Sequence, residues 1–531
     1  MKRRMPLFKD RFSLLWLAAG FLLLLFSNGF HMVPVAAWLG PIFMLRFLRG
    51  AKPLAGLIIG YLANAVVFFF QWFPAFQDAG IMFSVYTAVF GLLVYLPYVA
   101  DRLIFPRVKG FLSTLVFPTA WVVVEYLLHL YLPLGTFFNL AYTQNTNLPL
   151  LQLMSVTGLW GVSFLVTWFA AVMNYLWDHG FDWKKSSRGV AAYALILTVV
   201  LMGGGLRLAL SRPTADTVQV SVLTTNLDGE PLPDAETKEY DMLVKGTLPE
   251  AEKQAIKDKM DAMNADLFGR AKTQARAGSK IITFSEFNVQ ALSEDEQRVL
   301  NEAKALAREE QIYLVFPFEL TEPDLNKRKD PMIFQVNKSV MITPDGEIAY
   351  QYVKHNLLIG PEQEHTERGE RKILSIDTPY GRLASVICLD MEYPDFMRLA
   401  AQQNVDIVFS GAIDGTTATK GNPLHSIMAS YRTVESGFSL ARAGYYGQNI
   451  AADYQGRIIG AANHYTAGDR TVTARLPMKG IKTIYGMVGD FFPLTACALL
   501  VFFIAYSCFT SIRSRSALKK ELARKQTGIA P

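Results

Sequence analysis

The sequence predicts a polytopic α-helical membrane bundle of about eight spans that carries a large α/β domain. The chain has 531 residues, of which 51% are hydrophobic and only 18% charged, which is too apolar for a soluble protein of this length. The apolar residues concentrate in 1–212 and 486–510, whereas 215–480 has the charges and turn residues of a globular domain. Within that middle region, short β-rich runs alternate with helical patterns, which is typical of an α/β architecture.

The membrane helices are predicted from apolar segments, because a spanning helix needs about 20 mostly apolar residues. Seven candidates make up an N-terminal membrane domain, 1–212, and an eighth forms a C-terminal helix, 486–510, ahead of a basic tail, 511–531. The first candidate has no small-residue cleavage site and further spans follow it, so we interpret it as a helix rather than a signal peptide. The segments are 12–30, 33–48, 53–74, 82–99, 111–131, 151–177, 190–210 and 487–509.

The loops between these segments predict the orientation. Lys and Arg gather before the first span, after every second span and in the tail, whereas loops 74–80 and 132–148 contain neither. By the positive-inside rule we expect both termini in the cytoplasm and 215–480 on the outer, periplasmic face of a bacterial inner membrane. The net charge of +6 comes largely from these short basic segments, and no basic stripe is interleaved with aromatics, so no nucleic-acid partner is expected.

The globular region is expected to order its strands and helices as an α/β domain. Pro344-Asp345-Gly346 is a turn signal that joins two strand candidates. Helical patterns fit 249–277, 293–310, 394–403 and 423–436. The predicted strands are 217–226, 281–287, 312–320, 338–343, 347–353, 383–389, 406–411, 438–442, 448–453 and 471–475.

Cys388 is the only cysteine before position 497, and Cys497 and Cys508 both fall in the last apolar segment. The globular region therefore has no internal disulfide, and a lone thiol in an oxidising compartment indicates a reactive residue. Taken alone, a cysteine after an apolar strand is more often packed in a core. Glu286 and Lys354 also follow predicted strands, and polar groups at strand ends are where an α/β sheet displays its chemistry.

These three residue types together can perform nucleophilic acyl chemistry. A thiol near its reference pKa of about 8.5 is only slightly ionised at neutral pH, so a carboxylate within reach has to take its proton during attack. A lysine ammonium can then stabilise the oxyanion that develops, and the product is a thioester. The spacing of His355, His365 and Cys388 fits no standard zinc pattern, so no metal and no cofactor is expected.

The order of the three residues and the strings around them resemble the nitrilase superfamily. This resemblance implies a four-layer αββα sandwich over about 217–478 and a second assisting carboxylate, which Glu362 matches best and Glu364 matches as the alternative. Ser285 stands where the superfamily usually has proline. The matching strings are I-I-T-F-S-E-F, Y-V-K-H-N-L, V-I-C-L-D-M-E-Y-P-D, Y-R-T-V-E-S-G-F (431–438) and D-Y-Q-G-R-I-I-G (453–460).

The membrane region resembles the apolipoprotein N-acyltransferase family in P-T-A-W-V-V-V-E-Y (118–126), G-T-F-F-N-L-A-Y-T-Q (135–144) and 149–166, and in the order of its parts. The resemblance implies a membrane phospholipid as acyl donor and a diacylglyceryl lipoprotein as acceptor, with Leu389 and Asp390 at the substrate and oxyanion site. The interval from Lys354 to Cys388, 34 residues, is short for that family. A membrane-anchored amidase or hydrolase therefore stays open as the alternative, and a non-enzymatic binding or transport protein is the third hypothesis.

Three further features have two interpretations each. Glu125 lies in an apolar span, where a carboxyl either serves function or ties helices together. His425 opens a predicted helix, where capping or packing is favoured over chemistry. The small-residue loop 416–422 is a candidate flap over the site.

Overall fold

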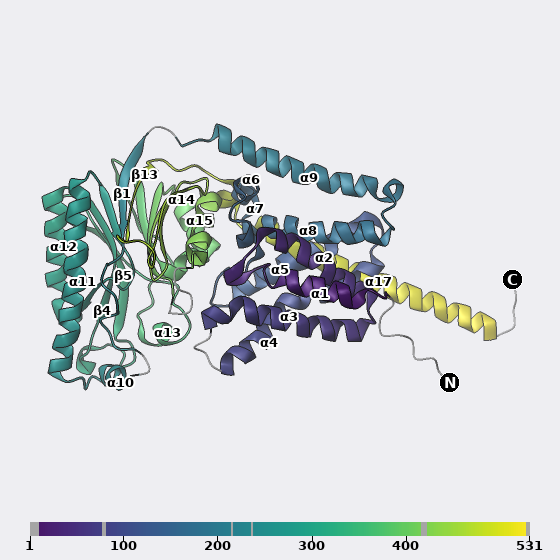
Figure 1. Ribbon diagram of the computed structural model, residues 1–531, viewed down its shortest axis with the longest axis horizontal. Helices are drawn as coiled ribbons and strands as arrows, with labels where there is room; N and C mark the ends of the chain where they lie inside the picture. Colours follow the sequence, from purple (N-terminus) through teal and green to yellow (C-terminus); the bar gives the residue numbers. More distant parts are fainter. Residues whose placement is uncertain (1–9, 77–80, 214–215, 235–236, 416–421, 527–531) are drawn as a thin grey trace.

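The computed structural model describes residues 10–76, 81–213, 216–234, 237–415 and 422–526. Its helices and strands divide between two ends of an elongated molecule, with the membrane helices at one end and a sandwich of two sheets at the other (Figure 1). The chain enters the membrane bundle first, crosses to the sandwich after α9 and returns to the bundle through α17, which runs along it and projects beyond it (Figure 1).

The bundle is formed by the apolar segments that the sequence predicts. Short 3-10 turns connect several of its helices, and α17 extends past the apolar part of its sequence into the basic tail. The helices are α1 (Ser13–Leu24), α2 (Pro34–Gly50), α3 (Pro53–Phe76), α4 (Ile81–Ile104), α5 (Val116–Tyr131), α6 (Leu148–Leu151), α7 (Met154–Thr157), α8 (Leu159–Asp178), α9 (Trp183–Leu210) and α17 (Phe491–Gln526).

The predicted count of eight spans is not confirmed. Within the described part of the chain, six helices are long and apolar enough to cross a membrane: Pro53–Phe73, Phe83–Arg107, Gly110–Tyr131, Leu159–Asp178, Trp183–Leu210 and Phe491–Ser516. The first predicted span is interrupted, because α1 ends at Leu24 after 12 residues and Gly29 then adopts φ +78°. Twelve helical residues rise only about 18 Å, against a hydrocarbon core of about 30 Å. The second predicted span, α2, has 17 residues and is also short.

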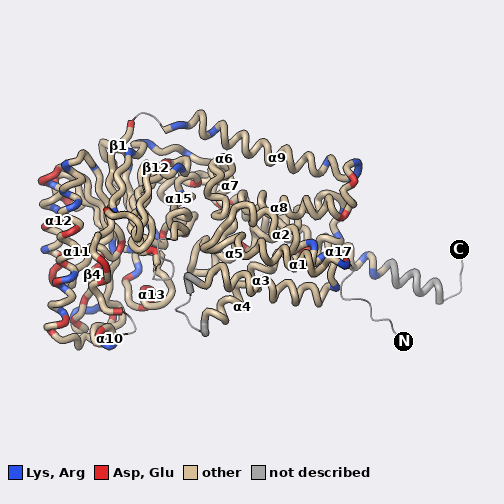
Figure 2. The backbone as a smooth tube through the Cα atoms, viewed as in Figure 1, with Lys and Arg blue, Asp and Glu red and all other residues tan. Residues whose placement is uncertain are grey.

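Charged residues of the bundle gather at the helix ends farthest from the sandwich (Figure 2). Arg49 donates to both carboxylate oxygens of Asp101 at 3.1 and 2.9 Å, and Arg46 and Arg49 both reach Asp178. The Arg49 and Asp101 side chains are 8% and 1% exposed. These pairs tie the ends of α2, α4 and α8 together.

The other end of the molecule holds two mixed sheets packed face to face. The first has the order β13-β1-β2-β4-β5-β6, with β3 also paired to β4, and the second has the order β12-β11-β10-β9-β8-β7. The first sheet comprises β1 (Thr217–Leu223), β2 (Ile281–Phe284), β3 (Val289–Leu292), β4 (Tyr313–Thr321), β5 (Gln335–Ile342), β6 (Ile348–Val353) and β13 (Thr471–Pro477). The second comprises β7 (Ser375–Thr378), β8 (Gly381–Ile387), β9 (Ile407–Ile413), β10 (Ser439–Tyr445), β11 (Gln448–Ala452) and β12 (Ile458–Asn463).

Helices cover the outer face of each sheet, which gives the expected four-layer αββα arrangement (Figure 1). Strand β4 shows why, because Leu314 and Phe316 pack under the outer helices while Tyr313 and Val315 face the second sheet. The short strands β3, β7 and β12 were not predicted. The helices of this domain are α10 (Lys238–Val244), α11 (Glu250–Arg276), α12 (Glu296–Glu310), α13 (Pro361–His365), α14 (Pro394–Gln402), α15 (Leu424–Ser436) and α16 (Ile484–Val488).

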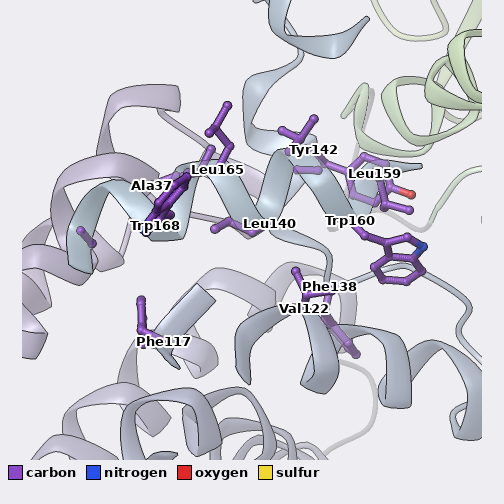
Figure 3. Packing of buried hydrophobic residues seen from close by; sticks show 14 of the residues in the cluster. Ala37, Phe117, Val122, Phe138, Leu140, Tyr142, Leu159, Trp160, Leu165 and Trp168 are labelled. Carbon is purple, nitrogen blue, oxygen red and sulfur yellow. The ribbon is translucent and has the colours of Figure 1, made fainter. Parts of the chain in front are cut away.

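The two ends of the molecule share one apolar core. Leu424, Met428, Tyr431 and Val434 of α15 belong to the same buried cluster as the membrane helices. Figure 3 shows part of this cluster on the membrane side, including Tyr142, Leu159 and Trp160. Helix α15 therefore lies between the second sheet and the bundle and couples one to the other.

Candidate active site

The predicted nucleophile occupies a strained turn at the end of a strand. Cys388 directly follows β8 and begins the 3-10 helix η8 (Cys388–Glu392), with φ +47°. A non-glycine residue in this left-handed region costs free energy, and such strain is concentrated at functional sites. The Sγ atom is 3.9 Å from the Ile413 carbonyl at the end of β9. The turn thus aims the thiol across the ends of neighbouring strands.

The Asp390 side chain stabilises this turn through hydrogen bonds. Its Oδ2 accepts hydrogen bonds from the Ile387 N–H at 3.0 Å and the Tyr352 hydroxyl at 2.7 Å. Its Oδ1 accepts from the backbone N–H of Asn356 at 3.0 Å and from its side-chain amide at 2.9 Å. A carboxylate offers about four acceptor positions, and all of them are used here. These bonds give the Asp390 side chain a structural role, and its contact with substrate stays a prediction.

Glu286, Lys354 and the partly exposed Glu362 meet in one cluster. The Lys354 Nζ atom lies 2.8 Å from Glu286 Oε1 and 2.5 Å from Glu362 Oε1. The side chains of Lys354 and Glu286 are 2% and 0% exposed. Glu362 Oε2 also accepts from the Leu358 N–H at 2.7 Å, which fixes the loop that joins Lys354 to α13.

The electrostatics of this cluster keep the lysine charged. Burial alone lowers the pKa of Lys354, but the Glu286 and Glu362 carboxylates outweigh it and raise that pKa well above its ordinary value. Lys354 is consequently an ammonium at any physiological pH. A fixed positive charge in a buried site is suited to stabilising an oxyanion.

Ile413 connects the cysteine to this cluster. Its carbonyl faces Cys388 Sγ, and its N–H donates to Glu286 Oε2 at 3.0 Å. Burial and the nearby Glu286 carboxylate raise the pKa of the Cys388 thiol well above its ordinary value, while Lys354 acts in the opposite direction. The resting group is therefore a neutral thiol, and attack requires a base to take its proton.

Leu389 is the second residue of η8, and its side chain is buried. The first N–H groups of a helix have no acceptor inside the helix. The Leu389 N–H directly follows Cys388 in the chain, so it can donate to an oxyanion that forms beside Cys388. The Leu389 side chain contributes only packing.

Sequence reasoning gave no structural role to several residues that build the site. Asn337, on β5, donates its amide N–H to Glu286 Oε1 at 2.7 Å. Arg442 forms a buried two-pronged ion pair with Asp414, the residue after Ile413, with Nη1 to Oδ2 at 2.7 Å. Ser285 donates to the Ala412 carbonyl at 2.7 Å and accepts from the Tyr445 N–H at 2.9 Å, bonds that proline cannot make. Each of these contacts joins segments that are distant in sequence, which no local pattern reveals.

A loop of the membrane bundle, which contains Gly135 and Thr136, contacts the end of the 3-10 helix that Cys388 begins. Both the N–H and the hydroxyl of Thr136 donate to the Glu392 carbonyl, at 3.0 and 2.9 Å. Gly135 has φ +55°, and a Cβ atom there would come within 2.5 Å of that same carbonyl oxygen. Tyr142 bonds Thr136 at 2.6 Å and accepts from Arg432 of α15 at 3.2 Å. The last residue of η8 is therefore held by the membrane domain.

The hydrogen bonds of Glu125 support the second of its two interpretations, in which it holds parts of the bundle together. Its carboxylate accepts from the Trp121 indole, the Leu140 N–H and the Asn139 amide, each at 2.8 Å, and so fixes the loop that carries Gly135 and Thr136.

His425 packs at the same junction, with Nδ1 3.7 Å from a Glu392 carboxylate oxygen and its ring against Phe137. The candidate flap 416–422 lies outside the described residues except for Asn422. Among the described residues, no group of three or more His, Cys, Asp or Glu side chains could hold a metal ion.

Comparisons with known proteins divide the chain in the same way. Residues 250–485 match the model of the carbon-nitrogen hydrolase family, and residues 18–172 match that of the apolipoprotein N-acyltransferase N-terminal domain. An apolipoprotein N-acyltransferase of Geobacter metallireducens is 22% identical over 475 residues, which covers 85% of this chain and 84% of the relative. One from Shewanella oneidensis is 22% identical over 411 residues, 73% of each chain.

Proteins that are similar to the hydrolase part alone are amidases by name. An omega-amidase of Saccharomyces cerevisiae is 26% identical over 182 residues, which covers 31% of this chain and 59% of the relative. A crystal structure of an amidase from Nesterenkonia sp. covers 50% of this chain and 94% of its own, with 18% identity and a TM-score of 0.38.

The match at the membrane end is what separates this chain from such amidases. Two family models occur in order along the chain, and the acyltransferase relatives align with most of it. The protein is a multi-pass membrane protein and a nitrilase-superfamily enzyme, and it belongs to the apolipoprotein N-acyltransferase family.

Proposed function

We propose that this enzyme moves an acyl chain from a membrane phospholipid to the α-amine of a diacylglyceryl-cysteine lipoprotein, through a thioester on Cys388. The observation that carries this proposal is the buried contact of Lys354 with Glu286 and Glu362, beside a neutral thiol held at positive φ. This arrangement supplies a base, an ammonium and a nucleophile in one water-poor site.

In the first half-reaction, Glu286 takes the proton of the Cys388 thiol as sulfur attacks the ester carbonyl carbon of the phospholipid. The carbonyl oxygen becomes an oxyanion, which the Lys354 ammonium and the Leu389 N–H stabilise. When the C–O bond breaks, the leaving alkoxide takes the proton from Glu286 and departs as a lysophospholipid. Cys388 then carries the acyl group as a thioester, and Glu286 is again a carboxylate.

In the second half-reaction, the neutral α-amine of the lipoprotein attacks the thioester carbonyl. Glu286 accepts a proton from the attacking nitrogen, the C–S bond breaks, and the proton returns to the departing thiolate of Cys388. The products are an amide and the free thiol, so every proton is accounted for without a metal or cofactor. Water in place of the amine would give a fatty acid, so the site must exclude it.

Glu362 serves this chemistry by holding Lys354. Its second oxygen is fixed by the Leu358 N–H, and its first lies against the ammonium. A lysine held between two carboxylates cannot swing away from the oxyanion. We therefore give Glu362 a positioning role and give proton transfer to Glu286.

Both substrates of this reaction are lipids, and the contact of the Gly135–Thr136 loop with η8 supports access from the membrane side. We propose that the membrane domain 1–212 and the closing helix 486–510 anchor the catalytic domain 215–480 at the periplasmic surface of the inner membrane. The termini, including the tail 511–531, are then cytoplasmic. The clustering of Lys and Arg at the far end of the bundle supports this orientation (Figure 2). Labelling single cysteines introduced at 228 and 515, in a chain whose three own cysteines are replaced by serine, with a membrane-impermeant reagent tests it, since only position 228 should react in intact cells.

The transfer reaction is tested with the purified full-length chain. The protein is incubated with phospholipid labelled in the acyl chain, and diacylglyceryl peptide is then added. We expect a labelled thioester that depends on Cys388, is sensitive to hydroxylamine and passes to the peptide amine. Release of free fatty acid at the same rate with and without peptide would overturn the transfer proposal.

A lipid amidase is the second candidate, favoured by the short 34-residue interval between Lys354 and Cys388 and by the amidase relative of the hydrolase part. The same assay separates the two, with labelled fatty-acid amide as a parallel substrate. Full activity of Cys388→Ser toward both substrates would exclude both candidates.

A further inference from the structure

Glu319 is a buried carboxyl group near Glu286 and Lys354, and the proposed mechanism gives it no role. It lies on β4, on the side that faces the second sheet, and is 2% exposed. Neither of its carboxylate oxygens has a hydrogen-bond partner among the residues that the structure describes. A carboxylate without donors is costly in a protein interior, whereas a protonated carboxyl needs an acceptor instead.

The two residues that pair with Glu319 across the sheet have acceptor oxygens available. In the sheet, Glu319 pairs directly with Asn337 on β5 and with Gln290 on β3. Asn337 uses its amide N–H on Glu286 Oε1 at 2.7 Å, and Gln290 uses its own on the Phe287 carbonyl at 2.5 Å. Because a carboxylate and a carbonyl can only accept, the orientation of both amides is fixed. Their oxygens, Asn337 Oδ1 and Gln290 Oε1, have no donor in the described part of the chain.

The charges around Glu319 agree with a neutral acid. Burial, and then the carboxylates of Glu286 and Glu362, raise the pKa of Glu319 well above its ordinary value, and Lys354 only partly offsets them. One ammonium already serves two carboxylates at distances of 2.8 and 2.5 Å. A third buried negative charge would have no partner.

We propose that Glu319 is a positioning residue that remains protonated and donates its O–H to Asn337 Oδ1, so that the Asn337 amide holds Glu286 toward Cys388. This proposal rests on the proposed function, because it assigns Glu286 as the base. The chain of bonds runs from the Glu319 hydroxyl to the Asn337 oxygen and from the Asn337 nitrogen to Glu286 Oε1. Glu286 Oε2 is held separately by the Ile413 N–H at 3.0 Å. Both oxygens of the base are thereby fixed, one of them through Glu319.

The proposal predicts different outcomes for two substitutions of similar size. Glu319→Gln keeps a donor in place, because its amide N–H can point to Asn337 Oδ1. Glu319→Leu removes the donor and leaves that amide free to rotate. An ionised, proton-accepting Glu319 predicts instead that both variants are equally impaired.

The experiment measures the acylation of Cys388 in a single turnover by labelled phosphatidylethanolamine in mixed micelles, using the full-length chain. We expect Glu319→Gln to stay within about threefold of the parent, and Glu319→Leu to be at least about tenfold slower, the equivalent of one lost buried hydrogen bond. In an Asn337→Leu background, Glu319→Leu should cause no further loss. Thermal denaturation of each variant reports whether it is folded, and Glu319→Met replaces Glu319→Leu if the latter does not accumulate.

Iodoacetamide provides a second readout that needs no lipid. The modification of Cys388, followed by mass spectrometry of its peptide, should slow in Glu319→Leu and in Glu286→Gln but not in Glu319→Gln. Equal loss in Glu319→Gln and Glu319→Leu, unchanged rates in both, or additive losses with Asn337→Leu would each overturn this inference. Unchanged acylation in Glu286→Gln would overturn the proposed function itself, so the two failures are distinct.

Discussion

Replacing Gly135 with alanine should slow the chemistry at Cys388, although Gly135 belongs to the membrane bundle. Gly135 has φ +55°, and an added Cβ would lie 2.5 Å from the Glu392 carbonyl oxygen and 2.9 Å from its carbon. Glu392 closes the 3-10 helix that Cys388 begins. The two backbones must therefore separate, and the displacement is transmitted along a five-residue turn to the nucleophile.

The size of the effect follows from this geometry. A carbon and an oxygen in ordinary contact are about 3.4 Å apart, so the substitution requires a shift of roughly 1 Å. It also stretches the two hydrogen bonds from Thr136 to the Glu392 carbonyl. A misplacement of 1 Å in a catalytic constellation can lower the rate by about 100-fold. Left-handed strain in the new alanine adds roughly 1–2 kcal/mol of instability.

Gly180 supplies the matched control. It has φ +63° and lies between α8 and α9, and no atom lies within 4 Å of a Cβ placed there. Gly180→Ala therefore carries the same backbone strain without the collision. Single-turnover acylation of Cys388 should fall by about 100-fold in Gly135→Ala and stay near the parent rate in Gly180→Ala. Equal rates in the two variants would refute the argument that the membrane loop positions the nucleophile.

Three further predictions concern the buried charges of the catalytic domain. Lys354→Met leaves the buried Glu286 carboxylate and the partly buried Glu362 carboxylate without a cation, so it should abolish acylation and cost about 3–5 kcal/mol of stability, measured as a lowered apparent Tm in detergent. Glu319→Gln should stabilise the protein relative to the parent increasingly as pH rises from about 4 to 8, by at most about 1.4 kcal/mol per pH unit. The reason is that the folded parent must keep this carboxyl protonated, whereas the unfolded chain releases the proton. A difference in apparent Tm between variant and parent that is equal at pH 5 and pH 8 would contradict a raised pKa. Arg442→Met strands the buried Asp414 carboxylate and should cost a similar 3–5 kcal/mol, which Asp414→Asn in the same chain should largely restore.

The parts of the site that the sequence predicts are those with a local signature. Glu286, Lys354 and Cys388 each follow an apolar run, and strands end beside all three. Alternation and turn residues are local properties, so they locate strand ends, whereas the ends of β2 and β6 in one sheet and of β8 in the other approach each other because the two sheets pack face to face.

The parts that could not be predicted depend on contacts between distant segments. The role of Asp390 is set by Tyr352 and Asn356, more than thirty residues earlier, so its side chain looked available when it was saturated. Helix α1 ends at Leu24, shortly before Ser27-Asn28-Gly29, and the predicted span 12–30 passed over this local turn signal. Glu319 read as an ordinary strand residue, because only its pairing with Asn337 places it near the base.

The raised pKa of the Cys388 thiol has a consequence for the proposed location of the enzyme. Oxidation and disulfide exchange act on the thiolate, and a lone thiolate on the outer side of the membrane would be exposed to both. Burial and the neighbouring carboxylates raise the pKa of the Cys388 thiol, and in the proposed mechanism Glu286, which the Asn337 amide and the Ile413 N–H hold, takes the proton only as an acyl carbonyl arrives. In that mechanism the same negative surroundings require an ammonium to stabilise the oxyanion, and Lys354 forms an ion pair with Glu286. In this proposal one set of charges both keeps the thiol protonated at rest and activates it during catalysis. This explains why the site has more carboxyl groups than the one that transfers protons.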